Sequence, residues 1–190
     1  HILDFWNKQA DTHKTSHSAS WGDLYMVEIE RDFICKEINN NNPNSVLDCG
    51  TSNGHSLIDL AKEFPNIQFS GFDFSKSMVE MFKNSLNNEP VVNISTPFEA
   101  DIRDLSSLNS TFDFIFTTRV LINLPTWEEQ KEGIRQMINR LNKDGKLIIM
   151  EGFWEPLCNL NSLRLSANIH PLREHDFNRY LKKESLDLCL

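Results

Sequence analysis

Residues Val46–Gly54 read VLDCGTSNG, a short apolar run followed at once by a turn with two glycines. The run predicts a buried strand, because its apolar residues are consecutive. Gly50 and Gly54 let the backbone turn sharply and let a ligand approach without a Cβ in the way. Apolar residues then recur at helical spacing over residues 57–64. The stretch therefore predicts a strand–turn–helix unit, and the start of its helix can receive a carboxylate.

The same alternation of strand and helix continues along the chain. Strands are predicted at residues 45–49, 67–73, 92–98, 112–117 and 147–150. A helix capped by Asp23 precedes them. Ser75 opens another helix, with Ser77 and Glu80 spaced as a capping box, and Thr126 with Glu129 caps a third that runs to Leu141. This order predicts an α/β fold, a doubly wound, mostly parallel sheet with helices on both faces. Such a sheet binds ligands beyond the carboxyl ends of its strands.

Composition narrows the class of protein. The 190 residues suggest a single domain, with residues 1–40 as an N-terminal arm and helix acting as a lid, 45–152 as a ligand-binding core, and 153–190 as a flanking segment. The formal net charge of −8 argues against a nucleic-acid substrate. The four cysteines form no C-x-x-C pair and no apolar run is long enough for a membrane span. We therefore expect reduced thiols, a cytoplasmic location, no bound metal, and a monomer or homodimer.

Polar residues follow four of the predicted strands. Asp48 supplies a negative charge for an ammonium or sulfonium group, and Asp73 can accept both hydroxyls of an adenosine ribose. The Asp101-Ile102 pair suits an adenine amino group and ring face. Thr118 and Arg119 close the fourth strand. Each feature alone also suits a strand end without a ligand, so the argument depends on their order.

As an ordered set these segments resemble the class I S-adenosylmethionine-dependent methyltransferases. Residues 48–54 resemble the first motif of that family, 71–73 its ribose-binding acid, 100–102 its adenine motif, 112–116 its fourth-strand motif and 141–147 the turn before its fifth strand. The resemblance covers residues 46–152 and implies S-adenosylmethionine as cofactor and S-adenosylhomocysteine as product. The cofactor-binding residues expected are Trp21, Asp48, Gly50, Ser52, Gly54, Asp73, Phe74, Met78, Asp101, Ile102, Thr118 and Arg119. Ser52 replaces the usual middle glycine of the loop and is expected to act as a spacer.

Three other interpretations remain open. Residues 50–54 also fit G-x-S-x-G, the nucleophile elbow of α/β-hydrolases, with Ser52 as nucleophile and His170 or His175 as base. No glycine-rich oxyanion segment lies upstream, and that interpretation leaves Asp73 unexplained. A dinucleotide-binding oxidoreductase would need a third glycine where Leu57 stands. A cofactor-binding domain without catalytic activity is the third interpretation.

The methyl acceptor is the least determined part of the prediction. A base is commonly outside the core motifs, and the candidates for catalysis are His13, His17 and Arg119. His13 and His17 have no obvious further metal ligands, and both also suit a solvent-facing arm. Arg119 can grip a carboxylate or phosphate, or pair with a nearby acid.

Residues 119–125, 159–164 and 175–180 resemble a bacterial subgroup of small-molecule methyltransferases often associated with surface-polysaccharide modification. This resemblance implies an oxygen acceptor on a sugar, or on a nucleotide-linked phosphate or phosphoramidate. The acceptor-binding residues expected are Tyr25, Asn123, Arg164, His175 and Asn178. A helical insertion that buries Leu160, Leu163 and Phe177 and touches no ligand is the alternative for residues 153–180. The family's sheet usually ends in two further strands, and only residues 185–190 are left for them, so we expect further residues at both ends of the chain.

Overall fold

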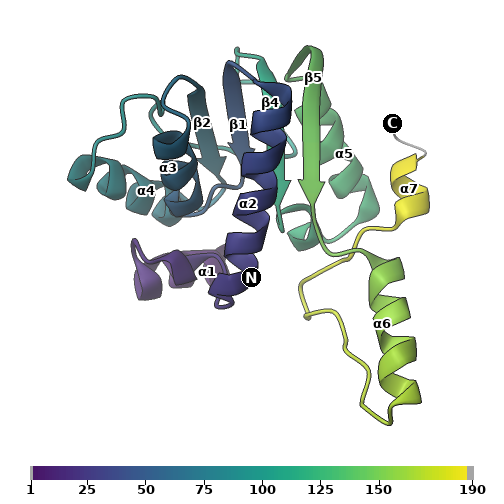
Figure 1. Ribbon diagram of the computed structural model, residues 1–190. Coiled ribbons are helices and arrows are strands. Elements are labelled where there is room, and N and C mark those ends of the chain that lie inside the picture. Colours follow the sequence, from purple (N-terminus) through teal and green to yellow (C-terminus); the bar gives the residue numbers. More distant parts are fainter. Residues whose placement is uncertain (1, 188–190) are drawn as a thin grey trace.

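A parallel sheet forms the centre of the computed structural model, which describes residues 2–187. Its five strands lie in the order β3-β2-β1-β4-β5, and every neighbouring pair is parallel. The strands are β1 (Ser45–Cys49), β2 (Gln68–Asp73), β3 (Phe98–Glu99), β4 (Phe112–Thr118) and β5 (Leu141–Met150). Figure 1 shows their carboxyl ends pointing to one edge of the sheet. The predicted doubly wound α/β fold is confirmed.

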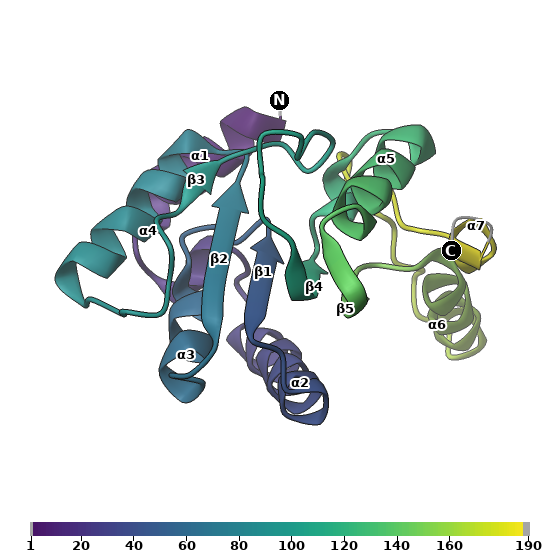
Figure 2. The same cartoon turned by 90° about the horizontal axis from the view of Figure 1, so that it is seen from above.

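Helices cover both faces of this sheet. Helices α2 (Leu24–Asn41), α3 (His55–Glu63) and α4 (Lys76–Asn88) contribute to one apolar cluster, which includes Val46 and Phe69. Helix α5 (Trp127–Ile138) and the short η2 (Leu121–Asn123) contribute to a second cluster around Leu47 and Ile115. Figure 2 shows α2 and α3 on one face of the sheet and α5 on the other. Successive residues of β1 therefore point to opposite layers, as a strand buried on both faces requires.

Three local predictions were wrong in detail. The strand predicted at residues 92–98 shortens to Phe98–Glu99 and one bridge between Phe69 and Ile94, because Pro97 has no N–H to donate to the ladder. Helix α4 is capped by Ser75, which accepts a hydrogen bond from Met78 N, and not by Ser77 and Glu80.

The turn predicted before β5 lies inside that strand. Phe112 pairs with Leu141 but Phe114 pairs with Lys146, so residues 142–145 form an irregularity in the ladder. A Cβ at Gly145 would lie 2.9 Å from the carbonyl oxygen of Asn142, which explains why a glycine stands there.

The N-terminal segment is an ordered pair of helices and not the loosely held arm that its polar composition predicts. Helix α1 (Ile2–His13) and the short η1 (His17–Ala19) precede α2. Ala10 is fully buried, and it belongs to an apolar cluster with Ala19 of η1 and Met78 of α4. Figure 1 shows α1 crossing below the carboxyl ends of β1 and β2. It therefore lies at the edge of the sheet where ligands of such folds bind.

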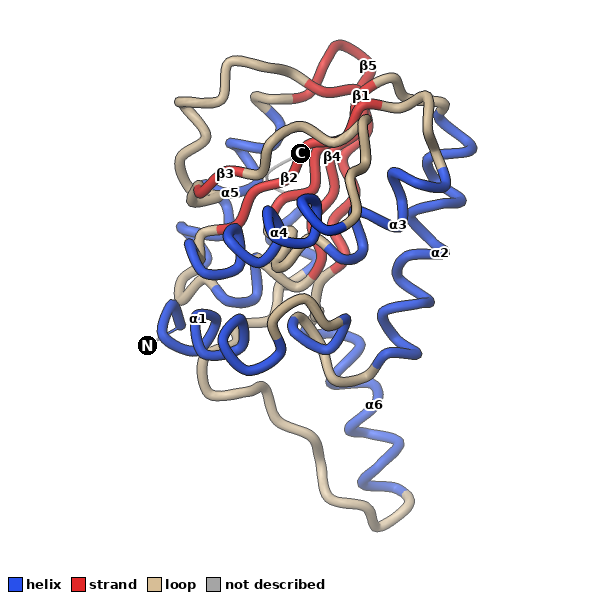
Figure 3. Tube along the Cα trace, turned by 90° about the vertical axis from the view of Figure 1, so that its left-hand side faces the viewer, coloured by secondary structure: helices blue, strands red, loops and turns tan. Residues whose placement is uncertain are grey.

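The segment after β5 leaves the body of the protein. Helix α6 (Trp154–Ser166) projects away from the sheet, and an extended stretch returns from its tip (Figure 3). Helix α7 (Lys183–Asp187) follows, so the terminal strands predicted to start near Ser185 are wrong for these residues; residues 188–190 lie outside the described range. Within residues 2–187, no helix combines the length and the apolar character that a membrane span requires.

Candidate functional site

A cavity lies at the carboxyl edge of the sheet, beneath α1. Its empty volume is about 810 Å³, including solvent at the mouth. The loops after β1, β2 and β4 and the segment after β3 supply most of its wall, as the rule for doubly wound sheets predicts. Nine of the predicted cofactor or acceptor residues line it: Gly50, Ser52, Asp73, Phe74, Asp101, Ile102, Thr118, Arg119 and Asn123. Four strand ends that are far apart in the sequence therefore meet in one site.

A second cavity, of about 510 Å³, adjoins the first. Both share Gly50, Ser52, Thr118 and Arg119 in their walls. Asp48 lines this second cavity, on the side of the loop that faces α2. The loop after β1 therefore contributes to the walls of both cavities, with Asp73 lining the first and Asp48 lining the second.

The loop after β1 depends on left-handed backbone at three alternating positions. Gly50, Ser52 and Gly54 have φ angles of 82°, 54° and 76°. A Cβ at Gly54 would lie 2.0 Å from Phe82, so this position excludes larger residues on packing as well as on backbone grounds. Ser52 adopts this left-handed conformation although it is not a glycine. Its backbone N–H donates to Asp73 Oδ2 at 2.9 Å.

The Ser52 side chain does not act as a nucleophile in this arrangement. Its hydroxyl is buried and donates to the sulfur of Met78 at 3.4 Å, not to a histidine. A serine nucleophile needs a base within hydrogen-bond reach. The contact with Met78 therefore does not support the hydrolase interpretation and is consistent with Ser52 as a spacer.

Asp73 is held firmly at the end of β2. Its two carboxylate oxygens accept hydrogen bonds from the backbone N–H groups of Ser52 and Ser75, at 2.9 and 2.8 Å. Burial raises its pKa to about 6 despite these hydrogen bonds. Burial, together with the charge of Asp73, raises the pKa of Asp48 to about 7. Two poorly solvated acids at one loop favour a ligand that brings hydroxyl donors and a positive charge.

The wall after β3 combines an apolar face with an anchored acid. Ile102 is buried, and Asp101 accepts hydrogen bonds from Nε and Nη2 of Arg103, at 2.9 and 2.5 Å. Burial opposes the ionisation of Asp101, but these bonds outweigh it and lower its pKa. Arg103 also pairs with Glu129 of α5 at 2.5 Å. Asp101 therefore stays ionised and is held in place by Arg103, and it forms part of this side of the cavity wall.

Arg119 lines both cavities, and two interactions hold its side chain. It adopts a left-handed φ of 57°, forms an ion pair with Glu30 of α2, and places its guanidinium 4.8 Å from the ring centre of Trp21. The sequence left open whether Arg119 binds a ligand or pairs with a nearby acid, and the structure contains the ion pair. Trp21 therefore supports Arg119, and Tyr25, which is 71% exposed, lines neither of these two cavities.

The predicted catalytic histidines lie outside the wall of either cavity. His13 contacts Ser18 through Nδ1 at 3.2 Å, and the ring of His17 packs against His55. The N-terminal segment packs on α4 through α1 and the buried Ala10 and Ala19, and η1 brings His17 against His55 of α3. The structure does not bring His13 or His17 together with Asp73 and Arg119.

The acceptor residues predicted after β5 are likewise absent from the cavity wall. Arg164 donates from Nε to the carbonyl oxygen of His170, and the ring of His175 packs on Phe177. His175 lines a separate cavity beside α6, and Asn178 lines none of those described. Leu160 and Leu163 are exposed, so the alternative of a helix that buries them is wrong too. The projection of α6 accounts for both results.

Two residues of the site were missed from the sequence. Trp6 of α1 lines the cavity, and its buried indole nitrogen has no hydrogen-bond partner within the described residues. Glu151 follows β5, and its carboxylate accepts hydrogen bonds from the backbone N–H groups of residues 120, 121 and 122, at 2.9, 3.0 and 3.2 Å. Burial raises the pKa of Glu151 to about 7. Glu151 lies at the end of a predicted strand, as Asp48 and Asp73 do, but its partners belong to the segment after β4 and show its role only in the folded chain.

The comparisons with known proteins agree with this geometry. A family model described as a methyltransferase domain matches residues 46–145. Demethylmenaquinone methyltransferase of Porphyromonas gingivalis is 27% identical over 139 residues, covering 73% of this chain and 54% of the relative. A ubiquinone/menaquinone biosynthesis C-methyltransferase of Geotalea uraniireducens is 26% identical over 122 residues, covering 64% and 51%. The chain thus spans about half the length of these relatives.

A solved structure has the same fold at low identity. Magnesium protoporphyrin IX methyltransferase of Synechocystis PCC 6803, solved with bound S-adenosylhomocysteine, superposes with a TM-score of 0.70 at 18% identity. The superposition covers 99% of this chain and 81% of that one. The family match covers more than half of the chain and includes the loop after β1 and the ends of β2 and β4. The chain belongs to the methyltransferase domain family.

Proposed function

We propose that this protein is an S-adenosylmethionine-dependent methyltransferase that acts on a small-molecule acceptor. The observation that carries the proposal is Asp73, a buried carboxylate at the end of β2 that lines a cavity together with Gly50 and Ile102. The cofactor expected from the sequence agrees with the family and with the solved neighbour that holds S-adenosylhomocysteine. The fit concerns chemistry as well as shape, since ribose hydroxyls can donate to a carboxylate that still has free lone pairs.

In this proposal the cofactor occupies both cavities, whose walls share Gly50 and Ser52. The ribose belongs at Asp73 and the adenine ring against Ile102, with Asp101 beside it. The methionine end belongs on the side of Asp48, whose negative charge suits an ammonium group. S-adenosylmethionine, when bound, supplies a methyl group already activated by a positive sulfur. The residues of this chain then have to orient the acceptor and exclude water, which makes alignment the main contribution of the protein.

For the acceptor we favour a small molecule with an apolar or aromatic body. Ile2, Trp6, Leu124 and Pro125 give the cavity an apolar wall on the side of α1 and η2. The ion pair with Glu30 compensates the charge of Arg119, which weakens its attraction for a phosphate. The names of the two bacterial relatives, both quinone-biosynthesis methyltransferases, support an acceptor of this kind.

An oxygen acceptor on a sugar or a nucleotide-linked phosphate is the second candidate. It is favoured by the guanidinium of Arg119, which lines the cavity and can bind a phosphate bidentately if the acceptor displaces Glu30. The two candidates differ in one measurable respect. Transfer to a phosphate-bearing acceptor requires the cation, so Arg119→Ala should abolish it, whereas transfer to an apolar acceptor should survive that change.

Calorimetric titration with S-adenosylmethionine and S-adenosylhomocysteine tests the cofactor assignment. We expect one site for each ligand, and no heat with NAD, which shares the ribose and adenine but not the methionine end. Absence of binding at millimolar ligand would overturn the proposal. Formation of S-adenosylhomocysteine in the presence of hydroquinones, and then of sugar phosphates, distinguishes the two acceptor classes. Binding of the cofactor without turnover on either panel would favour the interpretation as a non-catalytic domain.

A further inference from the structure

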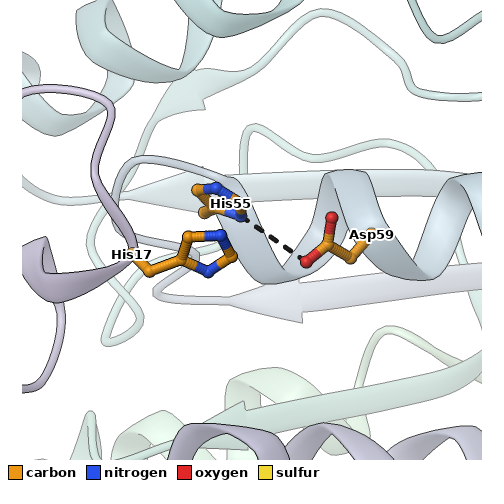
Figure 4. A group of neighbouring side chains, drawn as sticks. All are labelled: His17, His55 and Asp59. Atoms are coloured by element: carbon orange, nitrogen blue, oxygen red, sulfur yellow. Dashed lines mark ion pairs between the residues drawn. The ribbon is translucent and has the colours of Figure 1, made fainter. Parts of the chain in front are cut away.

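Two histidines and an aspartate meet on the outer face of α3, apart from the residues that line the cofactor cavity (Figure 4). His17 comes from η1, and His55 and Asp59 lie one helical turn apart on α3. The ring centres of His17 and His55 are 3.0 Å apart, and His55 Nδ1 lies 3.6 Å from Asp59 Oδ2. One nitrogen or oxygen atom of each residue lies within 4.8 Å of the others. The three side chains therefore converge on one point.

We propose that His17, His55 and Asp59 bind a divalent transition-metal ion of the zinc type. Imidazole nitrogens and a carboxylate oxygen are zinc ligands, at metal distances of about 2.0–2.2 Å. Tetrahedral geometry at those distances separates neighbouring ligand atoms by roughly 3.3 Å, so binding would require the adjoining rings of His17 and His55 to turn until one nitrogen of each faces the ion. Three protein ligands leave a fourth position for water.

A second feature of the cluster also indicates a missing partner. His55 Nδ1 is buried and makes no hydrogen bond among the described residues, because its contact with Asp59 Oδ2, at 3.6 Å, is too long for one. A buried ring nitrogen of this kind normally has a partner, because leaving it unsatisfied costs free energy. A metal ion bound to this nitrogen supplies that partner.

The charged groups around the cluster permit such an ion. Arg31 of α2 lies 3.8 Å from Asp59 Oδ2 and 3.4 Å from Asp32, and Lys62 of α3 pairs with Glu89 at 2.8 Å. Glu28 of α2 lines the same small cavity as His17 and Asp59. Each cation therefore has an acidic partner outside the cluster, and the choice of ion depends on coordination by His17, His55 and Asp59.

The sequence alone predicted no metal, because the pair His13 and His17 has no further ligands nearby in the chain. The fold supplies them from α3. A bound ion would add a link between the N-terminal segment and α3, beside the hydrogen bonds that Asn53 donates to the carbonyl oxygens of Lys14 and Ser16. Since α1 lines the cofactor cavity, the ion would hold that helix in place over the site.

Titration of the whole chain with zinc sulfate by calorimetry tests the proposal. We expect one zinc ion per chain, at least tenfold weaker binding in His17→Ala, His55→Ala and Asp59→Asn, and unchanged binding in His170→Ala, a matched control on an exposed residue. Magnesium sulfate should give no heat, because Mg²⁺ prefers oxygen ligands. Zinc affinity should fall as the pH is lowered from 7 to 5.5, as imidazoles take up protons.

Two outcomes would overturn the assignment. The first is no zinc binding at 100-fold molar excess, and the second is binding that is equally strong in all three variants, which would place the ion elsewhere. His17→Ala carries the decision if a change on α3 disturbs folding, because His17 is exposed on a short surface helix. Amide exchange of residues 14–20, followed with and without zinc, gives a readout independent of catalysis. Zinc should slow this exchange in the wild type and in His170→Ala, and not in His17→Ala.

Discussion

Replacing Asp73 by asparagine separates its role in ligand binding from its role in the fold. At pH 7.5 the raised pKa of about 6 means that burial of the charge costs about 3 kcal/mol relative to an ordinary aspartate. Asparagine removes this cost, but its amide nitrogen cannot accept, so one of the N–H groups of Ser52 and Ser75 loses its acceptor at a cost of about 1–3 kcal/mol. We therefore expect the free energy of unfolding to change by less than about 2 kcal/mol.

Cofactor affinity should respond much more strongly to the same change. A hydrogen bond to a charged group contributes about 1.5–3 kcal/mol, and Asp73→Asn removes the charge from two such bonds. A net loss of about 2–3 kcal/mol corresponds to roughly 30- to 150-fold weaker binding of S-adenosylhomocysteine by calorimetry. Asp144→Asn, an exposed position in the irregular turn of β5, is the matched control. A loss of less than threefold would refute the assignment of the ribose to Asp73.

The pH dependence gives an independent check on the same residue. The charged form of Asp73 prevails above its pKa of about 6, so its contribution to wild-type affinity should be full at pH 7.5 and fall as the pH drops through 6. In Asp73→Asn this contribution should disappear, while that of Asp48, whose pKa is about 7, remains. The unfolding equilibrium runs the other way. Because the folded state holds the Asp73 proton more tightly than the unfolded chain, stability should fall as the pH rises from about 4 to above 6. The asparagine variant should lose the share of this slope due to Asp73 and keep the shares due to Asp48 and Glu151, whose pKa values are also raised.

Three further changes are expected to act on stability, as measured by urea unfolding. Gly54→Ala places a Cβ against Phe82 at a left-handed φ, so it should lower the free energy of unfolding by about 2–5 kcal/mol. Gly22→Ala is the control, because open space surrounds its Cβ, and it should be nearly neutral. Equal effects of the two changes would contradict the packing argument. Glu151→Ala leaves three backbone N–H groups without their acceptor and should lower the free energy of unfolding by about 2–4 kcal/mol. Glu151→Gln should lie between the wild type and Glu151→Ala. A loss below about 0.5 kcal/mol in Glu151→Ala, roughly the scatter for surface changes, would show that water replaces the carboxylate. Arg119→Ala leaves Glu30 unpaired and should lower the free energy of unfolding by about 1–3 kcal/mol. Part of this loss should be recovered when Glu30 is neutralised as well. Strictly additive effects of the two changes would argue against the ion pair.

The alternation of strands and helices and the core of the site could be predicted because both follow from local pattern. An apolar run followed by a polar turn is visible at Asp48, Asp73 and Thr118, and parallel strands bring such ends to one edge. The failures have physical causes that a short window of sequence does not contain. Pro97 was inside an apolar alternation, but its effect on β3 depends on which neighbour the strand pairs with. Glu151 shows its role only once β4 and β5 are adjacent.

The flanking segments were harder because their partners are far away in the chain. The polar composition of residues 7–20 hides Ala10 and Ala19, two small residues whose burial against α4 orders the whole segment. His17 was assigned to catalysis on the basis of its chemistry, yet its neighbours are on α3, 38 residues downstream at His55. Arg164 and His175 were assigned to the acceptor from a resemblance, and the projection of α6 could not be read from their spacing.

Asn53 has a consequence for the kinetics of ligand exchange. Its side-chain amide donates to two carbonyl oxygens of the N-terminal segment, while its own backbone belongs to the loop after β1. If α1 opens, these hydrogen bonds would pull on the loop that we propose to contact the cofactor, and a ligand that orders this loop would slow the opening. Residence times of substrate and product should then depend on a residue that lines neither cavity. Asn53→Ala should shorten them through a faster dissociation rate while the association rate stays nearly constant.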